Sequence, residues 1–75
     1  MSALTERQQR LLAALKADRR VVTTGRVHEI NRLSLGAPKR TTARRDIAAL
    51  HRVGLLIEGG DFRGRFYLLT RKAAS

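Results

Sequence analysis

The sequence predicts a small α+β domain, mainly helical, in which three helices are followed by an antiparallel sheet of two to three short strands. Two observations carry this prediction. Up to Val53, apolar residues recur at three- and four-residue steps, as on the buried face of a helix. After Gly54 they form two continuous runs on either side of a glycine-rich segment, which favours a hairpin. With 75 residues, the chain has room for one domain, residues 1–75, and one thin core.

A first helix is predicted over residues 4–17. Its apolar stripe consists of Leu11, Leu12 and Leu15, with Leu4 one to two turns earlier. Thr5 and Gln8 have the spacing of a capping box, in which each side chain accepts from the other residue's backbone N–H. A β-branched run at residues 21–23 follows and predicts one short strand.

A second helix is predicted over residues 25–32, capped by Thr23 or Thr24. Its buried face is expected to consist of Val27, Ile30 and Leu33. Residues 34–38 end this helix, because Gly36 frees a turn and Pro38 cannot sit inside a helix.

The third helix is predicted over about residues 41–53, with a start at Thr41 or Thr42 and a stop at Gly54. Its buried face consists of Ala43, Ile47 and Leu50. The opposite side then carries Thr41, Arg45, Ala48 and Arg52, with Arg44 and His51 on one shoulder and Asp46 on the other.

Two strands are predicted over residues 55–58 and 65–69, joined by a long loop over residues 59–64 that contains three glycines. Residues 70–75 are expected to form a solvated tail, which leaves an ordered core of about residues 4–70. Helix, short strand, helix, turn, helix and hairpin is the order of a winged helix-turn-helix domain, with the hairpin as the wing.

The charge is strongly basic and is spread along the chain. There are 16 Lys and Arg against 6 Asp and Glu, for a net charge of +10. Residues 1–37 carry +4 and residues 38–75 carry +6, and thirteen of the cations are Arg, whose planar guanidinium suits phosphates and guanine edges. Such a distribution indicates a nucleic-acid partner. The alternative is an Arg- and Ala-rich composition that reflects a GC-rich genome.

The predicted DNA contacts lie on the third helix, the turn before it and the wing, residues 58–66. From Lys39 to Arg52 there are five cations and one acid, whereas ordinary solvated helices mix signs. Small residues such as Ala48 let a helix enter the major groove, and long ones such as Arg45 reach base edges. Wing arginines would reach a phosphate or the minor groove. The predicted set is Lys39, Arg40, Thr41, Thr42, Arg44, Arg45, Arg52, Arg63 and Arg65.

Other polar and aromatic residues are expected to be structural. Asp46 is expected to pair with Arg19, Arg20 or an arginine of its own helix; reading a cytosine amino group is the alternative. His28 and His51 are too few and too far apart for a shared site. Phe62 either folds onto the core or is an exposed contact. Strand core is expected for Phe66, Tyr67, Leu68 and Leu69.

One segment resembles a known family. Residues 42–50, Thr-Ala-Arg-Arg-Asp-Ile-Ala-Ala-Leu, followed by Gly54-Leu55-Leu56, are similar to the T-x-R-R-D-L-x-x-L…G-L-L run of DeoR-type winged-helix regulators. The resemblance implies that this run is the recognition helix and its exit into the wing. The preceding turn differs from the family's usual Val-Ser. Such regulators carry a sugar-phosphate-sensing domain after the wing, which this sequence does not match, so the resemblance carries over no effector-binding function.

Together these features predict a sequence-specific binder of double-stranded DNA: a small transcriptional regulator, a phage- or plasmid-type accessory factor, or an architectural protein. A protein-interaction module that docks on an acidic partner is the alternative, followed by RNA binding. We expect no enzyme, cofactor or metal, because no credible Ser/His/Asp set, P-loop or acidic cluster is present. No apolar run approaches the roughly 20 residues of a membrane span. A cytoplasmic, nucleoid-associated protein is expected.

The small size of the domain also bears on assembly. A single DNA-binding module buries only roughly 600–1,000 Å² of its surface, which is little for selecting one genomic site. We therefore expect a monomer or weak homodimer in solution and several copies on DNA. The copies would pair either through leucines of the first helix left exposed by the core, or side by side on DNA alone.

Overall fold

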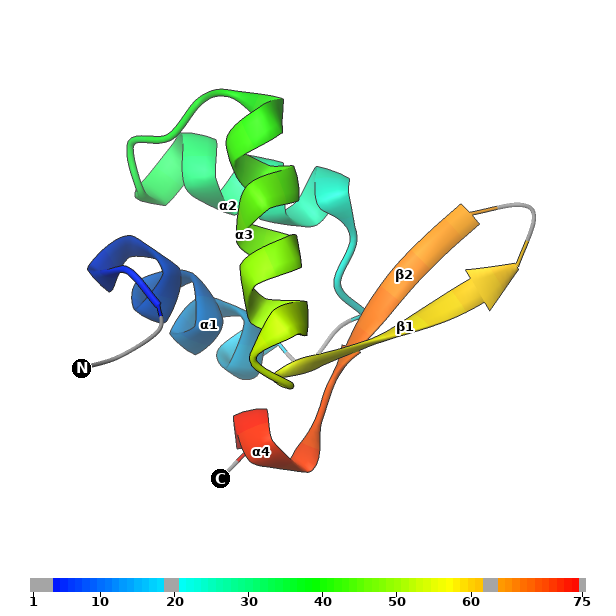
Figure 1. The fold of residues 1–75 in the computed structure, drawn as a ribbon. Coiled ribbons are helices and arrows are strands. Elements are labelled where there is room, and N and C mark those ends of the chain that lie inside the picture. The colour runs from blue at the N-terminus through cyan, green and yellow to red at the C-terminus, as the bar shows by residue number, and fades with distance from the viewer. Residues whose placement is uncertain (1–3, 19–20, 62–63, 75) are drawn as a thin grey trace.

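The computed structural model describes residues 4–18, 21–61 and 64–74. Its elements, in chain order, are α1 (Glu6–Asp18), α2 (Thr24–Ser34), α3 (Arg40–Arg52), β1 (Leu56–Asp61), β2 (Gly64–Leu69) and α4 (Arg71–Ala74). The first three helices pack together, and the β1–β2 hairpin projects to one side of them (Figure 1). The predicted class, α+β and mainly helical, is confirmed, and the layout is consistent with a winged helix-turn-helix.

The core lies where the three helices meet. Most of the predicted apolar stripes are buried, Leu4 and Leu12 are only partly buried, and Leu33 is exposed. Leu33 is 63% exposed, whereas Asn31 is fully buried. The reason is helix geometry: with 3.6 residues per turn, two three-residue steps from Val27 carry Leu33 about 120° away, while Asn31 lies only about 40° from Val27. The core consists of Leu11, Leu15, Val22, Val27, Ile30, Ala43, Ile47, Leu50, Leu55, Leu56 and Ala73.

The first two helices begin at the predicted caps. The backbone N–H of Gln8 donates to Thr5 Oγ1, and that of Thr5 donates to Gln8 Oε1, each at 3.1 Å. Thr23 is the N-cap of α2, and its hydroxyl accepts from the backbone N–H of Arg26 at 3.1 Å. Each cap satisfies donors that the first turn of a helix leaves unpaired.

The start of α3 differs from the prediction. Its N-cap is Lys39, in an extended conformation and without a capping side chain, so neither Thr41 nor Thr42 is the cap. The first turn of α3 therefore starts at Lys39, and the backbone N–H of Thr42 donates to the carbonyl of Lys39 at 3.1 Å. At the other end, Gly54 follows the helix with a positive φ of 83°, as expected of a glycine stop.

The hairpin is longer than predicted, and no six-residue loop exists. β1 and β2 pair without interruption from Leu56↔Leu69 to Asp61↔Gly64, so Gly59 and Gly60 belong to a strand. A Cβ at Gly59 would lie 2.6 Å from Cε2 of Phe66. At Gly60 a Cβ would overlap the carbonyl oxygen of Gly64, and φ is 105°. These glycines therefore allow close packing within the hairpin.

Only one face of the hairpin packs against the core. Tyr67 and Leu69 lie against it, whereas Leu68 is 41% exposed and Phe66 is half-buried. The expectation that all four are strand core is therefore wrong, because successive strand residues point to opposite faces. The short strand expected at residues 21–23 is reduced to one antiparallel bridge between Val22 and Tyr67, since α2 begins directly afterwards.

The segment expected to be a solvated tail folds as α4. Ala73 is buried in the core, and α4 lies beside α1 and β2. Lys72 Nζ donates to the carbonyl of Val53 at 2.9 Å, and Thr70 Oγ1 donates to that of Gly54 at 2.7 Å. These bonds satisfy carbonyls that the end of α3 leaves open. None of the helices in the described ranges combines the length and the apolar character needed to cross a membrane.

Candidate nucleic-acid interface

α3 presents one buried and one exposed face, in the phase that the sequence predicts. Ala43, Ile47 and Leu50 are buried, and Asp46 joins them on that side. Thr42 and Ala49 are half-buried. The exposed side consists of Arg40, Thr41, Arg44, Arg45, Ala48, His51 and Arg52.

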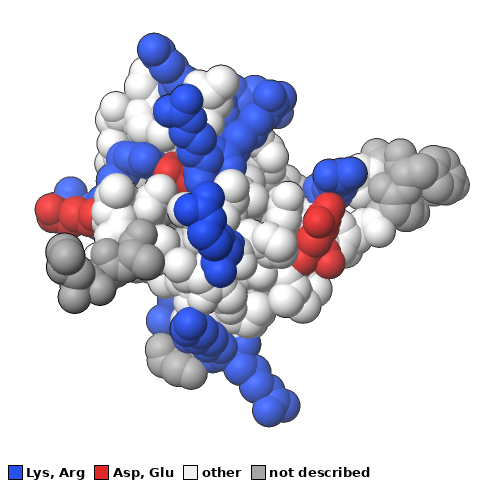
Figure 2. Space-filling view, in the orientation of Figure 1, with Lys and Arg blue, Asp and Glu red and all other residues white. Residues whose placement is uncertain are grey.

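The cations of this face have no acidic partners. None of their side chains makes a hydrogen bond or ion pair with another residue in the described part of the chain, and the set consists of Lys39, Arg40, Arg44, Arg45 and Arg52. Figure 2 shows Lys and Arg side chains running along the surface over α3. Unpaired like charges on one face repel one another, so this face gains from an anionic partner.

Three of the five cations of α1 and α2 have an acidic partner, whereas Lys16 and Arg32 have none among the described residues. Arg10 pairs with Glu6 at 2.8 Å, and Arg26 pairs with Asp18 at 3.0 Å and with Glu29 at 3.6 Å. Among the described residues, α3 and the residue before it therefore carry the largest group of cations without an acidic partner on one face.

The start of α3 adds a second source of positive potential. Lys39 and Arg40 are exposed at the N-terminal end of this helix, where the first backbone N–H groups have no intrahelical partners. The helix dipole also favours negative charge there. Side-chain and backbone donors at this end can therefore bind the same phosphate.

The wing is only partly described. Arg65 is 79% exposed near the start of β2, toward the tip of the hairpin, and its Nε lies 3.4 Å from Glu58 Oε1. This exposed ion pair is weak and leaves the guanidinium accessible. Arg63 and Phe62, which the sequence analysis also placed here, lie outside the described residues.

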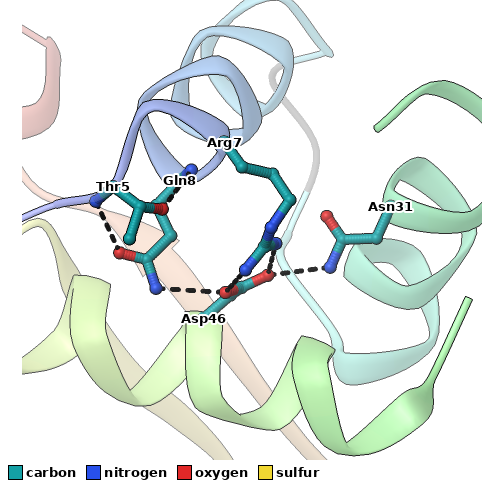
Figure 3. A network of polar contacts seen from close by, with 5 residues as sticks. All are labelled: Thr5, Arg7, Gln8, Asn31 and Asp46. Carbon is teal, nitrogen blue, oxygen red and sulfur yellow. Dashed lines mark hydrogen bonds and ion pairs between the residues drawn. The ribbon is translucent and has the colours of Figure 1, made fainter. Parts of the chain in front are cut away.

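Asp46 is held beneath the α3 face by residues of two other helices (Figure 3). Arg7 Nη2 donates to Asp46 Oδ1 at 2.8 Å, and Arg7 Nη1 donates to Oδ2. Gln8 Nε2 donates to Oδ1 at 3.1 Å, and Asn31 Nδ2 donates to Oδ2 at 2.8 Å. Asp46 is 0% exposed, so it reads no base; the network instead sets the position of α3 against α1 and α2.

This network fixes the charge of its members. Burial alone would raise the pKa of Asp46, but hydrogen bonds from Arg7, Gln8 and Asn31 outweigh it, and the pKa lies below its ordinary value. The hydrogen bond to Asp46 raises the pKa of Arg7. The pair is therefore ionised at neutral pH.

The structural role expected for Asp46 is confirmed, but its partner is not the expected one. The arginine is Arg7 of α1, not one from α3, while Arg19 and Arg20 lie outside the described residues. The only signal in the sequence is that Arg7 stands beside the apolar stripe of its helix. A position beside the stripe does not show which other helix the Arg7 side chain contacts.

The two histidines serve separate local contacts. His28 Nε2 lies 2.9 Å from the carbonyl oxygen of Pro38, in the turn before α3. The ring of His51 meets that of Tyr67 edge-on, with centroids 6.1 Å apart. Within the described ranges, no three His, Asp or Glu side chains lie together as metal ligands.

Comparisons of the chain with known protein families, with curated proteins and with solved structures find no match. The resemblance of residues 42–56 to DeoR-type regulators therefore stays a prediction. Inferences about function rest on the charge, exposure and geometry of α3 and the hairpin.

Proposed function

We propose that the protein binds double-stranded DNA in a sequence-specific manner, with α3 in the major groove and the hairpin on the backbone or in the minor groove. The observation that carries the proposal is the α3 face, with five exposed cations and no acidic partner among the described residues. A phosphate backbone supplies the missing negative charge along a line of similar length.

The shape of α3 supports a groove partner. Ala48 is exposed in the middle of the basic face, between Arg45 and Arg52. A small side chain at the centre lets the helix axis approach the floor of a major groove about 12 Å wide. The longer arginines on either side can then reach base edges or phosphates.

The biological role that fits best is a small transcriptional regulator or a phage- or plasmid-type accessory factor. The DeoR-like run in α3 favours regulation of transcription. Such a protein would work in the cytoplasm, associated with the nucleoid.

Salt dependence tests the proposal directly. Arg45 is expected at a base edge, so the other four cations of the α3 face and Arg65 would neutralise about five phosphates, and the log–log plot of affinity against salt should have a slope of about −4 to −5. Titration of a labelled random duplex at several salt concentrations measures this slope. A slope shallower than about −2 would contradict DNA binding through this face. Tighter binding to duplex RNA of the same sequence would favour RNA as the partner.

Ala48→Gln tests the groove geometry with the charge unchanged. Glutamine is a good helix former, so α3 should keep its fold while its centre becomes too bulky for the groove. We expect a loss of affinity of at least about tenfold for the preferred duplex. Ala13→Gln, at an exposed position of α1, is the matched control and should bind normally. Equal behaviour of the two variants would place the DNA elsewhere on the protein.

A further inference from the structure

The face of the hairpin that points away from the core carries a row of aliphatic side chains. Ile57 pairs with Leu68 in the β1–β2 register. The antiparallel bridge between Val22 and Tyr67, continued by one residue, places Val21 opposite Leu68. Val22 and Tyr67 point to the core, so Val21, Leu68 and Ile57 share the other face. We call these three residues the outer row.

No described element covers the outer row. Val21 is 49% exposed, Leu68 41% and Ile57 52%. Phe66 lies over Gly59 in the next cross-strand pair on the same face, and it does not pack against the core. Three neighbouring aliphatic side chains on one sheet face form a small contiguous apolar patch that is accessible to another molecule.

The structure also excludes α1 as an alternative surface for pairing of two copies. Pairing of two copies through α1 would need exposed leucines on that helix or just before it. Leu11 and Leu15 are buried, and Leu4 and Leu12 are partly buried and pack against the core. Leu33 is exposed, but no exposed apolar residue stands next to it along α2. The outer row is therefore the apolar surface of the described residues that is best suited to a second copy.

We propose that the outer row is the surface through which two copies of this protein meet when bound side by side on DNA; this rests on the proposed function. The outer row holds no charged side chain, so two copies can meet along it without bringing like charges face to face. An acidic partner protein would instead be drawn to the basic face of α3.

The small area of the outer row explains why two copies need DNA in order to associate. Three half-exposed aliphatic side chains offer on the order of 200–300 Å² per copy, against about 800 Å² in a stable interface. The net charge of +10 on each copy opposes association in solution as well. DNA relieves both limits, because it neutralises the charge and holds neighbouring copies at a high effective concentration.

Cooperative binding tests the proposal. The variant Ile57→Thr/Leu68→Thr keeps residues that favour strands and removes most of the apolar row. On a duplex with adjacent sites, the wild type should bind the second copy at least about tenfold more tightly than the first. The double variant should lose this gain and keep the single-site affinity. Leu33→Gln, an exposed leucine on α2, is the control and should remain cooperative.

Crosslinking on DNA tests the contact directly. The chain has no cysteine, so Leu68→Cys in the middle of the outer row introduces a single thiol. On the duplex with adjacent sites, a short bis-maleimide should join two Leu68→Cys copies at least about tenfold faster than two Leu33→Cys copies, because the Leu68 positions of neighbouring copies meet through the row. Equal rates, or full cooperativity in the double variant, would overturn the proposal and leave the face to a different partner. Failure of every variant to bind DNA would instead reject the proposed function.

Discussion

The guanidinium of Arg7 in α1 makes a two-point contact with the carboxylate of Asp46 in α3, 39 residues further along the chain. Asp46 has no exposed surface. A buried carboxylate is tolerated only when it is paired and hydrogen-bonded, so α3 is stable in the one rotation that brings Asp46 to Arg7. Arg45 lies about 100° around the helix from Asp46, and the same rotation turns it to solvent. The pair therefore links core stability to the direction of the basic face.

Removing the arginine should destabilise the fold far more than removing a neighbouring one. Arg7→Ala leaves the buried Asp46 charge without its cation and should lower the free energy of unfolding by about 3 kcal/mol. Arg10→Ala, which breaks an exposed pair with Glu6 one turn along α1, should cost less than about 1 kcal/mol. Urea denaturation followed by circular dichroism measures both. Similar losses would show that the Asp46 network contributes little.

The same network predicts how stability depends on pH. The pKa of Asp46 is lower in the folded protein than in the unfolded chain, where it is about 3.9. Its contribution is therefore fully present above the unfolded value and is lost as the pH falls through the folded one. Unfolding free energies measured from pH 6 down to pH 2 should decrease steeply below about pH 4. Asp46→Asn does not titrate at this position, so its curve should be flatter; parallel curves would contradict the assignment.

Most of the fold follows from local patterns in the sequence. Three- and four-residue apolar steps predict the buried faces of α1 and α3, and Thr5 and Thr23 predict two caps that the structure contains. The errors come from tertiary contacts. α4 has only alanines as apolar residues, so no periodic pattern marks it, yet Ala73 is buried because α1 and β2 lie beside it.

The basic face could be predicted because helix phase decides which side chains are exposed. Burial of Ala43, Ile47 and Leu50 is enough to place Arg45 and Arg52 outward. The link from Arg7 to Asp46 could not be predicted, since it depends on how two helices pack. Nor could the outer row, since it depends on the register that sets Val21 beside β2.

The glycines of the hairpin should differ sharply in their tolerance of substitution. Gly60 has a positive φ, and a Cβ there would overlap the backbone of Gly64, so Gly60→Ala should cost about 2 kcal/mol or more. A Cβ at Gly64 meets nothing within 4 Å, so Gly64→Ala should change stability by less than about 1 kcal/mol. Thermal denaturation of the two variants provides the comparison. A tolerated Gly60→Ala would mean that β1 and β2 can separate at this position.

If the protein binds DNA as proposed, two arginines should have different roles: Arg45 should recognise a base, and Arg65 should contact the phosphate backbone. Arg45 lies at the centre of the exposed α3 face, and Arg65 lies near the far end of the hairpin. Arg45→Ala should lose about 1–3 kcal/mol of discrimination at one base position, because a bidentate contact to a base edge disappears. Arg65→Ala should weaken binding to all duplexes alike and reduce the salt slope by about 1, because one phosphate contact disappears. Selection from random duplexes, followed by titration of the preferred and a scrambled sequence, measures both effects. Should Arg45→Ala keep the full ratio between the two sequences, the bases are read by another part of the protein, and α3 serves only to hold the backbone.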